Sequence, residues 1–128
     1  MPPLILLVED NETNQMLAFA VLQRDGYQVE LAGSSEEARQ KLASMRPDLI
    51  LMDLQLPGED GLALTRVLKG DSKTSSIPIV AMTAHAMIGD AELALAAGCA
   101  GYIPKPIDTR TLADQVRRFL AAAEPSPT

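Results

Sequence analysis

The sequence contains few cysteine, histidine and aromatic residues and no long hydrophobic run. One cysteine, Cys99, and one histidine, His85, among 128 residues exclude an internal disulfide and a usual structural zinc site. The longest apolar run, residues 4–8, is far shorter than the roughly 18 residues of a membrane span, and no basic signal region precedes it. We therefore expect a cytoplasmic protein that is neither exported nor membrane-bound.

The charge balance is acidic. Seventeen acidic and 11 scattered basic side chains give a net charge of −6, which argues against nucleic acid as a partner. There is no glycine-rich phosphate loop that could hold ATP. The length suits one compact domain, which we place at residues 1–123, with a disordered tail at 124–128.

Short apolar runs alternate with longer helical patterns, which is typical of an α/β protein built around a parallel sheet. The runs at 4–8 and 49–52 are apolar without alternation, as expected of strands covered on both faces. The predicted strands are 4–8, 27–32, 49–52, 77–82 and 101–103. The predicted helices begin near residues 11, 35, 61, 91 and 108, and the last of them ends near residue 123.

The predicted first helix has apolar residues on more than one face. Its inward stripe is expected to contain Leu17, Ala18, Val21 and Leu22. Met16, Phe19 and Ala20 then point outward and form a candidate docking patch for a helical partner, although packing in the core or against another molecule would also explain them. In the third predicted helix, Val67 is expected to face inward beside Leu64 and Leu68.

Chemically active side chains follow four of the predicted strands. They are Glu9, Asp10, Asp53, Thr83 and Lys105. Because ligands gather beyond the carboxyl ends of strands in open parallel sheets, we expect these groups to converge there. Three carboxylates at one edge repel one another, and a divalent cation with oxygen ligands, Mg2+, would relieve that repulsion.

The same cluster could hold a phosphoryl group. Asp53 lies centrally and is the best acceptor for an aspartyl phosphate, whose charge Thr83 and Lys105 could stabilise. Taken one at a time, these residues have ordinary interpretations: a helix cap for Asp10 or Thr83, a turn for Asp53, a solvated charge for Lys105. Only the joint pattern favours the functional interpretation.

At this point the chain resembles the receiver domain of two-component response regulators, the CheY-like family, and in pattern the small single-domain receivers of the DivK type. The resemblance covers residues 4 to about 120. Its motifs are LVEDN at 7–11, DLILMD at 48–53, Leu56-Pro57, Gly61, Thr83-Ala84 and Lys105-Pro106. Their combination and order make the resemblance highly specific.

The resemblance implies a doubly wound, flavodoxin-like sheet of five strands in the order 2-1-3-4-5. It also implies phosphorylation of Asp53 by a histidine kinase or a histidine phosphotransfer protein. Mg2+ would be held by Asp10, Asp53 and the backbone carbonyl of Gln55, with Glu9 acting through water. The family often has Asp where Glu9 stands, but the longer acid also occurs there.

The resemblance further implies a switch. The Thr83 hydroxyl and an inward-turning aromatic, here Tyr102, would alter the face of the fourth helix, last strand and last helix, to which a downstream protein binds. Tyr102 could equally be a core aromatic with its hydroxyl at the surface. The bond between Lys105 and Pro106 is usually cis in the family. Gln55 and His85 are the residues expected to set the phosphate lifetime.

Two other functions remain open. A magnesium-dependent phosphohydrolase would also form an aspartyl phosphate, but Asp53 is followed by Leu54 and Gln55, without a second acid two residues on. A phosphorylation-independent interaction module would not need the acids, Thr83 and Lys105 together. We therefore predict a stand-alone signalling switch that catalyses only its own phosphorylation and dephosphorylation.

Overall fold

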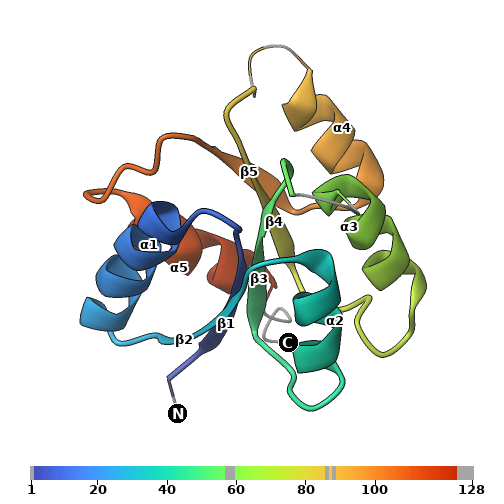
Figure 1. Ribbon diagram of the computed structural model, residues 1–128, viewed down its shortest axis with the longest axis horizontal. Helices are drawn as coiled ribbons and strands as arrows, with labels where there is room; N and C mark the ends of the chain where they lie inside the picture. The colour runs from blue at the N-terminus through green and yellow to red at the C-terminus, as the bar shows by residue number, and fades with distance from the viewer. Residues whose placement is uncertain (1, 57–59, 86, 88, 124–128) are drawn as a thin grey trace.

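The computed structural model describes residues 2–56, 60–85, 87 and 89–123, and within them strands and helices alternate (Figure 1). The predicted tail at 124–128 lies outside the described residues. The strands are β1 (Leu4–Val8), β2 (Gln28–Ala32), β3 (Leu49–Asp53), β4 (Ile79–Thr83) and β5 (Gly101–Pro104). The helices are α1 (Glu12–Arg24), α2 (Ser35–Leu42), α3 (Gly61–Gly70), α4 (Asp90–Ala97) and α5 (Leu112–Ala123).

The five strands form one parallel sheet in the order β2-β1-β3-β4-β5, which confirms the predicted fold. The register of strand pairing aligns Val8 of β1 with Met52 of β3, and Asp53 of β3 with Met82 of β4. The carboxyl ends of the three central strands therefore meet at one edge. The predicted bounds are close to those observed, except that α5 begins at Leu112 and not near Asp108.

Helices cover both faces of the sheet. Figure 1 shows α1 and α5 on one side and α2, α3 and α4 on the other. Successive residues of β1 divide accordingly: Ile5 and Leu7 pack in the core with α1 and α5, whereas Leu6 and Val8 pack in the core with the other three helices. Burial on both faces explains why the central strands are apolar without alternation.

Two residues predicted to face the core lie near the surface. Leu17 of α1 is 43% exposed and Val67 of α3 is 46% exposed. Each is roughly a quarter of a turn away from the centre of its helix's buried face, which in α1 is formed by Ala18, Val21 and Leu22. The inward stripes are therefore narrower than the apolar pattern predicts.

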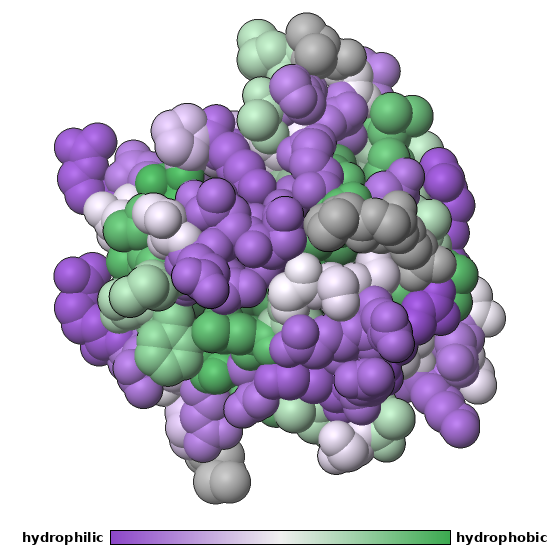
Figure 2. All heavy atoms as spheres, viewed as in Figure 1, coloured by the Kyte–Doolittle hydropathy of each residue, from purple (hydrophilic) through white to green (hydrophobic). Residues whose placement is uncertain are grey.

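Hydrophilic side chains dominate the face of the molecule shown in Figure 2, and hydrophobic ones form smaller areas between them. None of the helices in the described part of the chain has the length and apolar character needed to cross a membrane.

Candidate functional site

The sheet brings the predicted site residues to one edge. Glu9 directly follows β1, Asp53 is the last residue of β3, Thr83 is the last residue of β4, and Lys105 directly follows β5. The backbone N–H of Lys105 donates to the Thr83 carbonyl at 2.8 Å, so β4 and β5 remain paired up to the site. The ends of four strands thus contribute functional groups to the site.

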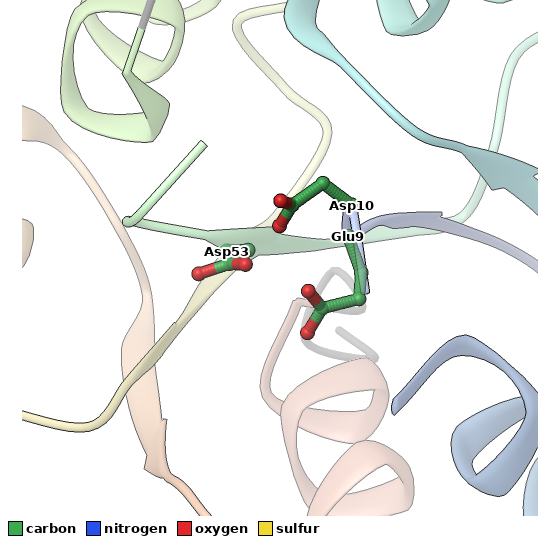
Figure 3. A group of neighbouring side chains, drawn as sticks. All are labelled: Glu9, Asp10 and Asp53. Atoms are coloured by element: carbon green, nitrogen blue, oxygen red, sulfur yellow. The ribbon is translucent and has the colours of Figure 1, made fainter. Parts of the chain in front are cut away.

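Three carboxylates form an acidic cluster at this edge. Oxygen atoms of Glu9, Asp10 and Asp53 all lie within 4.8 Å of one another. Glu9 and Asp53 are buried, whereas Asp10 is exposed. Figure 3 shows the three carboxylate groups extending to the same side from the ends of β1 and β3. Oxygen ligands at this spacing suit a hard divalent cation.

Lys105 bridges two members of the cluster. Its Nζ lies 3.0 Å from Glu9 Oε1 and 3.0 Å from Asp53 Oδ2. Burial on its own lowers the pKa of Lys105, but the two carboxylates outweigh this effect and raise the pKa above its ordinary value. The ammonium group is therefore a permanent positive charge beside Asp53 at neutral pH.

Glu9 is fully buried, and its carboxylate is only partly satisfied. Oε2 accepts a hydrogen bond from the Asn11 backbone N–H at 3.1 Å, while the Gln15 side chain donates to the Glu9 backbone carbonyl. Oε1 faces Lys105 but receives no hydrogen bond in acceptable geometry from the described residues. Burial, together with the contact to Asp53, raises the pKa of Glu9.

The turn after β3 holds Asp53 firmly. The Gln55 backbone N–H donates to Asp53 Oδ1 at 2.9 Å, which leaves Oδ2 for Lys105. The first residue of α3, Gly61, packs directly on the Asp53 backbone: a Cβ there would lie 2.2 Å from the Asp53 carbonyl oxygen. The glycine in the sequence motif is therefore a requirement of close backbone approach.

Thr83 is completely buried, and its hydroxyl both donates and accepts a hydrogen bond. Oγ1 donates to Asp90 Oδ2 at 2.9 Å and accepts from the His85 backbone N–H at 2.9 Å. Gln55 Nε2 donates to the same Asp90 oxygen at 3.1 Å. Sequence reasoning missed Asp90; the available signal was an acid at the start of a predicted helix beyond Thr83.

The remaining predicted residues lie around this centre. Tyr102 in β5 is 40% exposed. The peptide bond between Lys105 and Pro106 is cis, as the resemblance implied. On α1, Met16 is 71% exposed and Ala20 is exposed, but Phe19 is half-buried and so only partly available to a partner.

Comparison with known proteins places the chain in a class. The family model of the response regulator receiver domain matches the sequence at residues 5–117, nearly the whole chain. The protein belongs to this family and has a CheY-like fold, as its motifs indicated. It is therefore a receiver domain of two-component signal transduction.

Particular relatives agree with this class. The chain is 40% identical over 123 residues to the polar-differentiation response regulator DivK of Brucella anthropi, covering 96% of this chain and all of that protein. A structure of a putative response regulator from Chloroflexus aurantiacus matches with a TM-score of 0.90 and 33% identity, over 94% of this chain and 99% of that one.

A third relative carries a metal. The receiver domain of a sensor histidine kinase from Pseudomonas aeruginosa matches with a TM-score of 0.86 and 37% identity, over 94% of this chain and 99% of that one. Its structure has a magnesium ion coordinated in the active-site cleft.

Proposed function

We propose that this receiver accepts a phosphoryl group on Asp53 from a phosphohistidine residue of a histidine kinase or a histidine phosphotransfer protein. The observation that carries the proposal is the geometry at Lys105, whose ammonium group contacts Asp53 within a cluster of three carboxylates. A fixed cation and an acceptor carboxylate in contact are what phosphoryl transfer needs, because its catalysis depends on positioning and charge stabilisation.

The donor set suits Mg2+ as the cofactor. Three clustered carboxylates lie at the site, and the buried Glu9 Oε1, although 3.0 Å from Lys105 Nζ, receives no hydrogen bond in acceptable geometry from the described residues. Asp10, Asp53 and the Gln55 backbone carbonyl would hold the ion, with Glu9 acting through water. The ion would supply positive charge to the oxygens of the transferred phosphoryl group.

The chain's own residues do the remaining work. An oxygen of Asp53 forms a bond to phosphorus while the bond from phosphorus to the histidine nitrogen breaks, and the histidine is released as free imidazole. Lys105 stabilises the phosphoryl oxygens through its ammonium group, and the Thr83 hydroxyl donates a hydrogen bond to one of them. Loss of the phosphoryl group to water returns the chain to its starting state, with Gln55 and His85 at the mouth of the site setting the lifetime.

The output of the switch is a change in partner binding. Thr83 ends β4 and Tyr102 lies in the neighbouring β5, so a movement of the Thr83 hydroxyl acts directly beside the strand that carries the aromatic ring. Leu93 and Leu95 on α4 are each about half exposed, at 48% and 51%. One helix of the proposed output face, α4, thus offers apolar side chains to a downstream protein.

The donor would dock on α1. Met16, Leu17 and Ala20 are exposed there, next to the chain segment that carries Glu9 and Asp10. Met16→Glu should slow phosphotransfer from a phosphohistidine donor at least about ten-fold and leave labelling by a small acyl phosphate unchanged. Val67→Glu, which charges an exposed apolar site on α3, is the matched control. Equal slowing of both reactions by Met16→Glu would contradict the docking proposal.

The test of the phosphoacceptor is the mass of the intact protein. After incubation with acetyl phosphate and Mg2+, the wild type should gain one phosphoryl group, whereas Asp53→Asn should gain none. Removing Mg2+ with a chelator should abolish the gain. If the wild type gains nothing, the chain acts as a phosphorylation-independent interaction module; if Asp53→Asn gains as much as the wild type, another residue is the acceptor.

A further inference from the structure

The buried hydroxyl of Thr83 is already engaged before any phosphoryl group arrives. It donates to Asp90 Oδ2 at 2.9 Å. The direction of this bond is fixed by chemistry, because an ionised carboxylate can only accept. The His85 backbone N–H, also a donor, occupies the acceptor side of the same hydroxyl.

A hydroxyl has a single proton. The proton that Thr83 gives to Asp90 is therefore the same proton that the proposed function requires on a phosphoryl oxygen. The two hydrogen bonds exclude each other, since the Thr83 hydroxyl has no second proton to donate. Phosphorylation must break the bond between Thr83 and Asp90.

Gln55 contacts both Asp90 and the proposed acceptor, Asp53. Its side-chain Nε2 donates to Asp90 Oδ2 at 3.1 Å, and its backbone N–H donates to Asp53 Oδ1 at 2.9 Å. One residue thus connects the acceptor carboxylate to the carboxylate that holds Thr83. Gln55 therefore lies in direct contact with both Asp53 and Asp90.

From these contacts we infer that Asp90 is a positioning residue that holds Thr83 in the unphosphorylated state and competes with the phosphoryl group for its hydroxyl. The inference rests on the proposed function and deepens it, because it identifies the residue that favours the unphosphorylated state of the switch. Asp90 is also the first residue of α4. Release of Thr83 therefore removes a hydrogen bond from the carboxylate at the start of α4, a helix of the proposed output face.

The test is a titration of Mg2+-loaded protein with beryllium fluoride, a mimic of the phosphoryl group. Asp90→Ala removes the competing acceptor and should tighten binding about five-fold, a change typical of the net contribution of one hydrogen bond. Asp90→Asn keeps a neutral acceptor and should tighten binding about two-fold. Unchanged affinity in Asp90→Ala would overturn the inference.

Charge alone could also tighten binding, so two controls are needed. Thr83→Val removes the hydroxyl at nearly constant shape, and in that background Asp90→Ala should have no effect on affinity. Glu92→Gln removes the same charge from the same first turn of α4 and should leave affinity unchanged. If the gain persists in the Thr83→Val background, or if Glu92→Gln reproduces it, the inference is wrong.

A second measurement separates this inference from the proposed function. The side-chain rotamer of Thr83, measured by NMR couplings of its methyl group in metal-free protein, should be single in the wild type and averaged in Asp90→Ala. A rotamer that Asp90→Ala does not alter would overturn the inference. A wild type that does not bind beryllium fluoride would instead overturn the proposed function, and the rotamer would still decide the inference.

Discussion

Lys105 Nζ lies 3.0 Å from Asp53 Oδ2, so the proposed acceptor carboxylate has a fixed cation beside it before any reaction. The same ammonium lies 3.0 Å from Glu9 Oε1. Because Glu9 and Asp53 are both buried, this single charge offsets the repulsion between them. Lys105 therefore has a role in the resting protein as well as in the proposed reaction.

Replacing Lys105 should separate these two roles. Lys105→Gln should slow phosphorylation by acetyl phosphate at least about ten-fold, because the developing charge on the phosphoryl oxygens loses its fixed cation. Mg2+ should bind as tightly as in the wild type or more tightly, since the carboxylates then lack another counter-charge. Stopped-flow labelling and isothermal titration measure the two quantities. Wild-type labelling in Lys105→Gln would contradict the assigned role.

Glu9 should make stability depend on pH and on Mg2+. The pKa of Glu9 is raised in the folded protein. Its favourable contribution to the free energy of unfolding is therefore present below its ordinary pKa and is lost as the pH rises through the raised pKa. At pH 7.5 without metal, Glu9→Gln should therefore raise the melting temperature by roughly 3 °C, and this gain should disappear near pH 4. Mg2+ should stabilise the wild type more than the variant. Calorimetry with and without chelator measures these differences in melting temperature.

Gly61 should tolerate no side chain. A Cβ there would meet the Asp53 carbonyl oxygen at 2.2 Å, so Gly61→Ala must displace the backbone at the site. It should cost more than about 2 kcal/mol of unfolding free energy. Gly70→Ala, at the other end of α3 with open space around its Cβ, should be neutral or stabilising by up to about 1 kcal/mol. Urea unfolding of both variants provides the comparison.

Cys99 should react slowly in the native protein. Burial raises the pKa of its thiol, so the reactive thiolate is a smaller fraction at pH 8 than in a free cysteine. Alkylation by iodoacetamide should be at least about ten-fold faster in 8 M urea than in buffer, as measured by mass. Equal rates would show that the core around Cys99 opens readily.

The positions of the strands and the convergence of functional groups at their ends followed from short, strong sequence patterns, whereas the strand order came from the resemblance to the receiver family. Uninterrupted apolar runs mark strands that are covered on both faces, and the polar residue after each run marks the edge of the sheet. The apolar runs that end at Val8, Met52 and Met82 thus predicted where the residues that follow them would meet.

Other features depend on tertiary packing that no local pattern records. Leu17 and Val67 are apolar, but their place on each helix depends on how far that helix is rotated against the sheet. The bond between Thr83 and Asp90 depends on the path of the connection from β4 to α4. A sequence shows an acid at that helix start and not the distance to a threonine seven residues earlier.

The distribution of the helices between the two faces of the sheet determines which binding surfaces a bound partner would cover. The proposed donor surface on α1 lies on one side of the sheet, and α4 with its exposed leucines lies on the other (Figure 1). A donor bound at Met16 would leave Leu93 and Leu95 uncovered. However, α5, the other helix of the proposed output face, lies beside α1. A donor bound on α1 would therefore leave the α4 side of that face open to a downstream protein and would restrict approach from the α5 side.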